Sequence, residues 1–173
     1  MTKPVYAFYP SPCGMIALFA GENGLQRVLI DVATDHVAAR FGGAGRLAEP
    51  LSHPLIAEVV AALNRYFQGQ LQTFDLPLEL HGLSPFTTTI LHALQQVPFG
   101  TTCTYGSLAV AAGHRGAARA VGRVMAINPL PLVIPCHRVI SVSGPGGYSG
   151  GRGLQTKQLL LDFERSILGR DDG

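Results

Sequence analysis

Residues 105–140 read YGSLAVAAGHRGAARAVGRVMAINPLPLVIPCHRVI, and this stretch sets the architecture of the second half of the chain. Its first part predicts a short helix over Tyr105–Ala112, a turn at Gly113-His114 and a second helix over Gly116–Ile127. Asn128-Pro129 should end that second helix, because the residue before a proline avoids the helical region. Two short helices joined by a glycine-containing turn have the outline of a helix-turn-helix.

Three arginines mark the second of these helices. Arg115, Arg119 and Arg123 recur every fourth residue, which predicts one positively charged stripe along its surface. Small residues between them, such as Ala118 and Gly122, would let the backbone approach a flat or grooved partner closely. The same small residues would equally allow tight helix packing, so the residues alone leave both interpretations open.

The last part of the stretch places Cys136 and His137 side by side on apolar flanks. Burial among such flanks raises the pKa of a thiol and leaves it unreactive, unless a neighbouring base or positive charge stabilises the thiolate. His137 is a candidate for that base. Two interpretations therefore stand: a nucleophile with its base, or a small core cysteine beside a surface histidine.

The composition is that of a folded globule, since 47% of the 173 residues are hydrophobic and only 14% are charged. No apolar run is long enough to span a bilayer, and the first residues lack the apolar core of a signal peptide. We therefore expect a cytoplasmic protein without membrane association. Cys13, Cys103 and Cys136 are odd in number and lack C-x-x-C spacing, which argues against both a disulfide framework and a structural zinc site.

The net charge of +2 hides an asymmetry between the two halves of the chain. Residues 1–81 carry 5 Lys/Arg and 7 Asp/Glu, a balance of −2, whereas residues 82–173 carry 8 and 4, a balance of +4. This excess favours a polyanion as partner, and a few solvated arginines are the plain alternative. Between Gly100 and Lys157 every charged residue is positive: Arg115, Arg119, Arg123, Arg138, Arg152 and Lys157.

The first half of the chain has a different pattern. Short β-type runs at residues 5–9, 15–19 and 25–30, separated by turn signals, predict an antiparallel meander. Ser52 is placed to cap a following helix whose apolar residues keep the 3.6-residue period over 55–67. The first half is therefore predicted to be a unit of strands followed by a helix.

Proline and glycine residues interrupt the secondary-structure pattern around residue 82, where we place a domain boundary. Ser84-Pro85 has the chemistry of a helix start, and the helix should continue to Val97. We predict an α+β protein with an N-terminal domain at residues 1–81 and a mostly helical C-terminal domain at residues 82–173.

Two features near the C-terminus bear on the Cys-His pair. The glycine-rich segment 143–151 lacks the phosphate-binding pattern and is typical of a flap, with Tyr148 able to stack on a base. Residues 154–168 predict an amphipathic helix that buries Leu159, Leu160, Phe163 and Ile167, with Glu164 on or beside the buried face. Glu164 therefore needs a partner, which is either a surface salt bridge or a histidine that it orients.

Together these segments resemble the O6-alkylguanine-DNA alkyltransferase family, also called methylated-DNA:protein-cysteine methyltransferases. The resemblance covers residues 82–173 in order and with family-like spacing, and the first half looks like the family's ribonuclease-H-like domain. It implies a winged-helix or helix-turn-helix C-terminal domain. The matching residues are Tyr105, Ala118–Gly122, Asn128-Pro129, Ile134–Ile140, Gly147–Gly151 and Lys157–Glu164.

The resemblance implies direct-reversal DNA repair without a cofactor. The protein would bind duplex DNA in the minor groove, flip out O6-alkylguanine, and transfer the alkyl group irreversibly to Cys136, once per molecule. O4-alkylthymine is a further candidate substrate. His137 would act as base through a water, Glu164 would orient His137, and Tyr105 would donate to the purine ring.

The resemblance also implies two sets of binding residues. Arg119 would fill the gap left by the flipped nucleotide, and Asn128 would brace the turn after its helix. The implied DNA-binding residues are Arg119, Ala118, Arg115, Arg123, Asn128, Ser143 and Gly122. The implied base pocket consists of Tyr105, Val139, Tyr148, Ser149, Met125 and Asn128.

The chain departs from the family pattern in places. The segment 82–87 is one residue longer than usual and Leu91 stands where a tryptophan is common, changes that concern packing between domains. Some relatives bind a structural zinc through N-terminal Cys and His, and we predict no metal here because the arrangement is not reproduced by Cys13, His36, His53 and His81.

Two rival functions stand beside alkyl transfer. A cysteine hydrolase would also use Cys136 and His137, but it has no need of a basic helix-turn-helix. A DNA-binding protein without transfer activity, either a regulator or an alkyltransferase-like lesion binder, would not need the cysteine. The presence of Cys136 together with Tyr105 and Glu164 favours transfer. We expect a monomer with no obligate protein partner.

Overall fold

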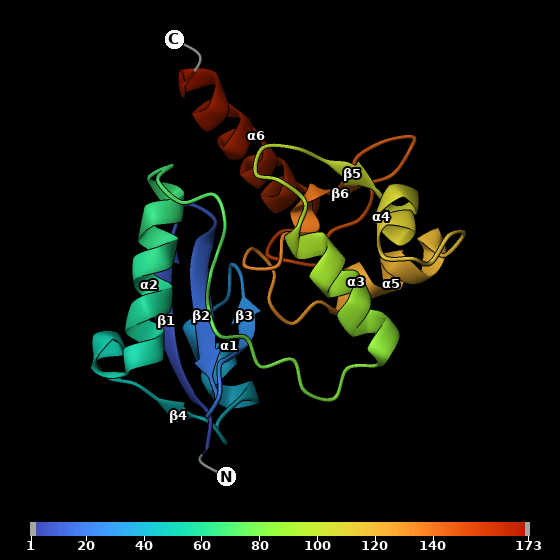
Figure 1. Ribbon diagram of the computed structural model, residues 1–173. Helices are drawn as coiled ribbons and strands as arrows, with labels where there is room; N and C mark the ends of the chain where they lie inside the picture. The colour runs from blue at the N-terminus through green and yellow to red at the C-terminus, as the bar shows by residue number, and fades with distance from the viewer. Residues whose placement is uncertain (1–2, 172–173) are drawn as a thin grey trace. The chain divides into compact units, whose positions relative to one another are not determined.

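The computed structural model describes residues 3–171, and its contacts divide the chain into two compact units, Met1–His81 and Gly82–Gly173 (Figure 1). The first unit combines a sheet with helices and the second is mostly helical, so the predicted α+β class is confirmed. No helix within residues 3–171 is both long and apolar enough to cross a membrane.

The N-terminal unit is built on the predicted meander. β1 (Val5–Ser11), β2 (Gly14–Ala20) and β3 (Leu25–Leu29) pair in antiparallel fashion, which confirms the prediction. A two-residue strand that the pattern did not indicate, β4 (Gly45–Arg46), adds to the free edge of β1 in parallel orientation. The strand order is therefore β3-β2-β1-β4.

The alternation of side chains along the strands gives this sheet two apolar faces. On one face, Tyr6 and Phe19 stack at 5.3 Å between ring centroids and pack with Val37 of α1 (Thr34–Arg40). On the other face, Tyr9 donates a hydrogen bond of 2.9 Å to Asn64 of α2 (Pro54–Phe67). Sequence periodicity missed α1 because this seven-residue helix buries only one side chain.

The predicted cap of α2 is wrong. Ser52 lies in a separate 3-10 turn, η1 (Pro50–Ser52), where its hydroxyl donates to the Glu49 carbonyl at 2.6 Å. The helix begins at Pro54, whose fixed φ suits a first helical position, and His53 before it is extended and makes no side-chain cap. Proline geometry outweighs the capping chemistry of Ser52 at this helix start.

The C-terminal unit begins with the predicted helix α3 (Pro85–Gln95), capped by the Ser84 hydroxyl, which accepts a hydrogen bond from the Thr87 amide. The helix-turn-helix follows as α4 (Tyr105–Ala111) and α5 (Ala118–Ile127), which lie against each other. α5 starts two residues later than predicted, since the turn before it extends through Gly116 at φ +85°. Arg115 therefore lies in that turn and not on the helix.

A short sheet joins the start of the helix-turn-helix to the cysteine segment. β5 (Cys103–Thr104) pairs in parallel with β6 (Val139–Ile140), which directly follows the 3-10 turn η2 (Cys136–Arg138). Thr104 and Ser107 form a complete capping box that fixes the first turn of α4. Tyr105, the first residue of α4, is thereby held near Cys136.

The last helix, α6 (Leu154–Asp171), is present as predicted but buries a different face. Leu159 is 41% exposed, so its assignment to the buried face is wrong, and Leu161 is buried in its place. The buried face also carries Lys157 and Glu164, two charged residues seven positions apart and thus on one side of the helix. The sequence pattern predicted Glu164 on or beside the buried face, but it gave no sign that Lys157 is buried as well.

Candidate active site

Cys136 and His137 are both buried, with 4% and 0% of their surface exposed. They form the start of η2, and every residue from Leu130 to Val139 is buried around them. The interpretation that made His137 a surface residue is therefore wrong. A cysteine and an imidazole held together in an apolar interior need specific polar partners.

Those partners meet at Glu164 of α6. His137 Nε2 lies 2.8 Å from Glu164 Oε1, and Arg138 donates from Nε to Oε2 at 3.0 Å and from Nη2 to Oε1 at 2.9 Å. The Gly100 amide donates to Oε2 at 2.9 Å, and Arg138 Nη1 donates to the Val97 carbonyl at 2.7 Å. Three residues therefore hold the buried Glu164 carboxylate: His137, Arg138 and Gly100.

A glycine at position 100 is required for this arrangement. Gly100 has φ +72°, and a Cβ there would lie 2.3 Å from Leu168 Cδ1. Any larger residue would force the Leu168 side chain to move and would be strained at this positive φ. The loop that follows α3 is therefore part of the site through its Gly100 amide.

Two of the six cations between Gly100 and Lys157 do not belong to a basic surface. Arg138 and Lys157 are 4% and 1% exposed, so the expectation of a surface containing all six is wrong. Arg115, Arg119, Arg123 and Arg152 are exposed. Sequence reasoning missed both buried roles, although the seven-residue spacing from Lys157 to Glu164 was a usable signal.

Lys157 is bound entirely by backbone carbonyls. Its ammonium donates to the carbonyls of Val139 and Pro145, each at 2.5 Å, and to that of Gly147 at 3.1 Å. An ammonium has three N–H donors, so all three have partners. Lys157 thereby connects α6 to β6 and to the glycine-rich loop.

The protonation states within the site follow from burial and from these contacts. Burial raises the pKa of the Cys136 thiol to about 11, against smaller opposing effects of Asn128 and Lys157. Burial lowers the pKa of His137, although Glu164 opposes that shift. Burial alone would raise the pKa of Glu164, but the hydrogen bonds from His137 and Arg138 outweigh it and lower the pKa to about 2.

At neutral pH the resting site therefore holds a neutral thiol, a neutral imidazole and a carboxylate. Because the carboxylate only accepts hydrogen bonds, His137 must carry its proton on Nε2. Nδ1 then keeps its lone pair, and it is buried without a hydrogen-bond partner among the described residues. This tautomer is the one that can accept a proton on the side away from Glu164.

Cys136 opens onto a cavity of about 240 Å³ within the C-terminal unit. Of the predicted pocket residues, Tyr105, Met125, Tyr148 and Ser149 line it. Val139 and Asn128 do not belong to the lining. The lining residues that the prediction lacked are Gly122, Ala126 and Gly147 together with Cys136 itself.

The two residues outside the lining have other contacts. Val139 is fully buried in β6, and its carbonyl accepts from Lys157. Asn128 braces the turn after α5, donating from Nδ2 to the Ile134 carbonyl at 2.9 Å and accepting from the Leu130 amide at 3.0 Å. Asn128 therefore holds the start of the cysteine segment in place.

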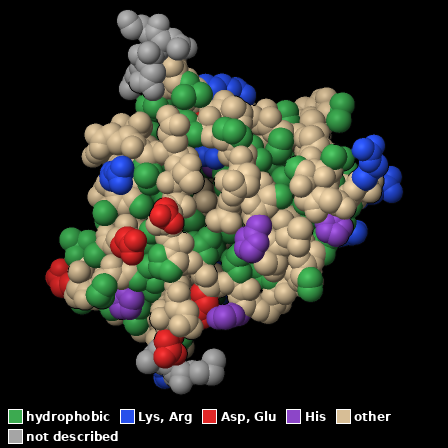
Figure 2. Space-filling view, viewed as in Figure 1, with side chains coloured by type: hydrophobic (Ala, Val, Ile, Leu, Met, Phe, Trp, Pro, Cys, Tyr) green, Lys and Arg blue, Asp and Glu red, His purple; other side chains and the backbone are tan. Residues whose placement is uncertain are grey.

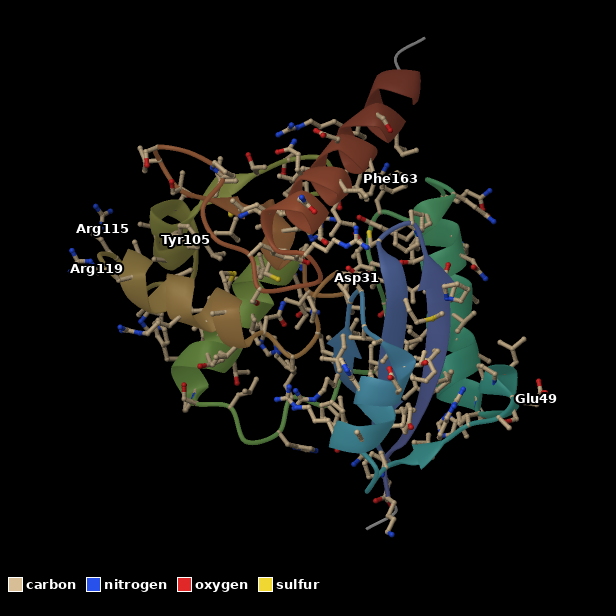
Figure 3. All side chains as sticks on the ribbon, turned by 180° about the vertical axis from the view of Figure 1, so that it is seen from behind. Asp31, Glu49, Tyr105, Arg115, Arg119 and Phe163 are labelled. Carbon is tan, nitrogen blue, oxygen red and sulfur yellow. The ribbon has the colours of Figure 1, made fainter. Side chains whose placement is uncertain are left out.

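Three exposed arginines lie on the helix-turn-helix. Arg115 in the turn and Arg119 at the start of α5 extend outward, and Tyr105 lies on the neighbouring helix (Figure 3). Arg123 is exposed one turn after Arg119. Basic side chains gather over the α4 and α5 region, and acidic ones over the N-terminal unit (Figure 2). Ser143 lies in an exposed turn after β6, where its amide donates to the Ser141 hydroxyl.

The small residues of α5 lie in two different environments. Gly122 lines the cavity, and a Cβ there would lie 4.0 Å from Tyr105 Cε1. Ala118 is half-buried at the start of the helix, beside the exposed Arg119. Val121, Val124 and Met125 are the buried residues of this helix.

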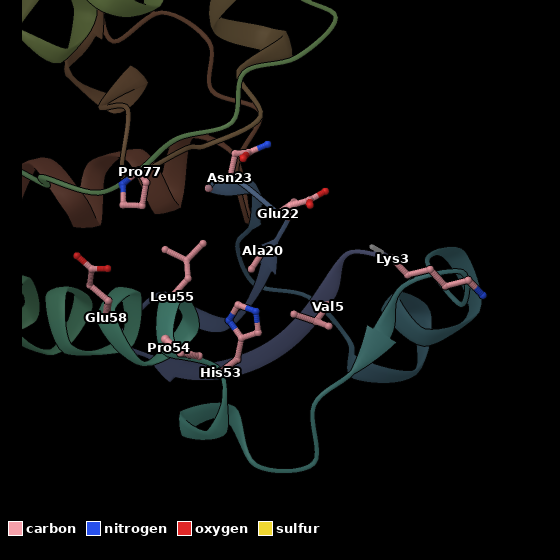
Figure 4. Close-up of a pocket in the computed structure, with 12 residues that line it drawn as sticks. Lys3, Val5, Ala20, Glu22, Asn23, His53, Pro54, Leu55, Glu58 and Pro77 are labelled. Atoms are coloured by element: carbon pink, nitrogen blue, oxygen red, sulfur yellow. The ribbon is translucent and has the colours of Figure 1, made fainter. Parts of the chain in front are cut away.

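A second cavity, of about 640 Å³, lies within the N-terminal unit (Figure 4). The ring of His53 projects into it, with Glu22 and Glu58 on either side. Its lining contains no cysteine, and residues 3–171 hold no group of three or more His, Cys, Asp or Glu that could bind a metal ion. Cys136 lines the smaller cavity of the C-terminal unit instead.

The Glu164 cluster should make the protein sensitive to acid. The pKa of Glu164 falls from its ordinary 4.5 to about 2, so its contribution to stability is present above pH 4.5 and is lost as the pH falls through about 2. Between pH 5 and pH 2 we expect the free energy of unfolding to decrease by about 2–3 kcal/mol more in the wild type than in Glu164→Gln. Urea unfolding followed by far-UV circular dichroism measures this difference. Parallel pH profiles of the two proteins would contradict it.

The fold and the site define a class: a two-domain α+β protein whose helix-turn-helix unit carries a buried cysteine beside a histidine–glutamate pair. Residues 85–166 match the DNA-binding domain, and residues 5–80 the ribonuclease-like domain, of 6-O-methylguanine DNA methyltransferase. The methylated-DNA–protein-cysteine methyltransferase of Mycolicibacterium paratuberculosis is 48% identical over 161 residues, covering 92% of both chains. The chain belongs to the methylated-DNA–protein-cysteine methyltransferase family.

Other relatives agree along nearly the whole length. The methylated-DNA–protein-cysteine methyltransferase of Methanosarcina acetivorans is 35% identical over 166 residues, covering 93% of this chain and 98% of the relative. The crystal structure of Mycobacterium tuberculosis O6-methylguanine methyltransferase has a TM-score of 0.81 at 34% identity, covering 95% and 94%. The crystal structure of Mycobacterium tuberculosis OGT in complex with DNA has a TM-score of 0.77 at 36% identity, covering 94% of each chain.

Proposed function

We propose that this protein repairs alkylated DNA by direct reversal, transferring the alkyl group from guanine O6 to its own Cys136. The observation that carries the proposal is the position of Cys136, which opens onto a cavity while His137 and Glu164 form a buried pair beside it. The relatives named above support the same reaction, and one of the similar structures is a complex with DNA.

The transfer is a displacement at the alkyl carbon. Cys136 sulfur forms a bond to that carbon as the bond from the carbon to guanine O6 breaks, and the electron pair leaves with the guanine. The thiol proton passes, through a water, to His137 Nδ1, because Nε2 is committed to Glu164. Tyr105, which lines the cavity, donates its hydroxyl to the purine ring as negative charge develops there.

The resting thiol is neutral, so the proton must leave during the reaction. Because its pKa is about 11, the Cys136 thiol is almost entirely protonated at neutral pH, so in the resting site it reacts only slowly with oxidants and other alkylating agents. The product is a thioether, and the described site holds no group suited to cleave it. Each molecule should therefore react once.

DNA binding is assigned to the exposed face of the helix-turn-helix. Arg115, Arg119 and Arg123 supply the positive charge, and Ala118 leaves room for close approach of the backbone in a narrow minor groove. Arg119 fills the gap left by the extruded nucleotide. Gly122 supports this face from the cavity that it lines, and Asn128 supports it by bracing the turn after α5. Ser143 contributes a polar contact to DNA from its exposed turn.

The cavity suits a single flipped base. Its volume of about 240 Å³ is below the roughly 300–1,000 Å³ of sites for larger ligands. Tyr148 and Ser149 from the glycine-rich loop and Met125 from α5 form its walls. Extruding a base costs a few kcal/mol, and least for a mispaired one, so weakened pairing at the lesion provides selectivity without sequence readout.

The rival function is binding of the DNA lesion without alkyl transfer. For both functions we propose that the protein acts as a monomer. Cys136 distinguishes the two functions, since a pure binding protein has no need of a thiol backed by His137 and Glu164.

The test is transfer of a labelled methyl group. The protein is incubated with a molar excess of duplex DNA that carries a labelled methyl on guanine O6, and the peptides are analysed by mass spectrometry. We expect the label on the Cys136 peptide, with no more than one methyl per protein molecule. Label released into solution, or found on the Cys13 or Cys103 peptide, would contradict the mechanism.

A matched arm separates DNA binding from chemistry. Arg119→Ala should slow transfer from duplex DNA while leaving the slower reaction with the free base O6-methylguanine unchanged, because Arg119 is exposed and lies outside the cavity lining. Equal losses in both assays would place Arg119 in the chemical step and overturn its assignment to DNA.

A further inference from the structure

We propose that Lys157 is a positioning residue with two tasks: its ammonium fixes the loop wall of the cavity, and its charge stabilises the Cys136 thiolate during transfer. The second task rests on the proposed function. Lys157 was absent from both sets of predicted site residues, and its carbonyl contacts place it behind the cavity and outside its lining.

The first task follows from the three carbonyls that Lys157 binds. Pro145 and Gly147 flank Gly146, whose φ is +70° and whose Cβ position lies 2.6 Å from the Tyr105 hydroxyl oxygen. The backbone of the loop is therefore pressed against the Tyr105 ring, where only glycine fits. Gly147 itself lines the cavity, so the loop that Lys157 holds is part of its wall.

The third carbonyl extends the same connection to the cysteine segment. Val139 lies three residues after Cys136, and it pairs with Cys103 in the β5–β6 sheet. One ammonium thus joins both sides of the cavity to the first turns of α6. A neutral side chain of equal length would leave all three carbonyls without this donor, and that of Val139 is buried away from water.

The second task follows from what Lys157 lacks. Among the described residues Lys157 has no carboxylate partner, although its side chain is almost completely buried. The group that responds to its charge is Cys136: Lys157 lowers the thiol pKa, and Cys136 in turn raises that of Lys157, while burial acts on both in the opposite direction. A thiolate at Cys136 would be the buried counter-charge that Lys157 otherwise lacks.

The other titratable groups around Cys136 have different tasks. His137 is neutral in the resting site and bonded to Glu164, and Arg138 is engaged with the same carboxylate. Tyr105 faces Cys136 across the cavity from α4. Lys157 is therefore the buried cation available to the sulfur.

The experiment measures thiol reactivity without DNA. Wild type and Lys157→Met are treated with iodoacetamide over a range of pH, and the rate of alkylation at Cys136 is followed by peptide mass spectrometry. Because loss of an opposite charge near a thiolate raises the thiol pKa, we expect the midpoint for Cys136 to rise by about one unit or more. At pH 8 the rate should fall about tenfold.

Internal and matched controls are present in the chain. The profiles of Cys13 and Cys103 should not move. Arg165→Met, which removes an exposed cation from the same helix, should leave the Cys136 profile unchanged. An unchanged Cys136 profile in folded Lys157→Met would overturn the electrostatic task, and its folding is checked by far-UV circular dichroism.

Lys157→Arg separates the two tasks and covers the case in which Lys157→Met fails to fold. It keeps the charge, so the iodoacetamide midpoint at Cys136 should stay within about half a unit of wild type. Its planar fork cannot reproduce the three-carbonyl contact, so transfer from O6-methylguanine in duplex DNA should fall about tenfold or more. Unimpaired transfer would overturn the loop task. A wild type that reacts with iodoacetamide but not with alkylated DNA would instead count against the proposed function.

Discussion

Cys136→Ala is expected to abolish alkyl transfer completely and to leave DNA binding within about twofold of wild type. Cys136 supplies the sulfur that lines the cavity, and no other thiol is found in that lining. The substitution removes one atom from a buried side chain, at a cost of about 1 kcal/mol in stability, so the fold and the arginine face should persist. Labelled-methyl transfer and a DNA-binding titration with the same duplex measure the two effects.

Cys136→Ser and Cys103→Ala complete this test. Cys136→Ser keeps the size of the side chain but replaces a thiol with a far weaker acid, so it should also be inactive. Cys103→Ala, a change in β5 two residues before Tyr105, should retain transfer because Cys103 does not line the cavity. Transfer that survived in Cys136→Ala would mean that another residue accepts the alkyl group.

Arg138→Met is expected to lower the free energy of unfolding by about 3–5 kcal/mol. Arg138 donates three hydrogen bonds to Glu164 and one to the Val97 carbonyl, and its guanidinium lies 5.6 Å from the Phe99 ring centroid. Methionine fills similar space, but it leaves a carboxylate with 0% exposure without its strongest partner. Urea unfolding followed by far-UV circular dichroism is suitable, since the chain has no tryptophan.

Arg165→Met is the matched control for Arg138→Met. Arg165 also pairs with an acid, Asp162, but at 3.6 Å and with both side chains more than half exposed, so its loss should cost less than about 1 kcal/mol. The double variant Arg138→Met/Glu164→Gln should be more stable than the sum of the two single effects predicts, because it removes both members of a buried pair. Equal costs for Arg138→Met and Arg165→Met would show that the buried contact does not stabilise the fold.

Interactions between residues close in sequence determine most of the helices and strands, so these could be predicted from the sequence alone. Neighbouring residues alone determine the start and end of these helices: the Ser84 cap, the capping box of Thr104 and Ser107, and the break at Asn128-Pro129. The helices of the C-terminal unit could therefore be predicted closely. The strands of the meander carry their own period-2 pattern. The order of the family motifs likewise pointed to Cys136 and His137.

Only the tertiary structure decided the surroundings of the reactive residues. β4, β5 and β6 have two residues each and form only because a distant partner strand is present. Arg138 and Lys157 have the same charge in sequence as the exposed Arg119, yet they are buried because Glu164 and three backbone carbonyls compensate them. The charge of a residue is evident from the sequence, but its desolvation and its partners depend on contacts across tens of residues. These contacts determine whether the charged group is buried in the site or exposed on the surface.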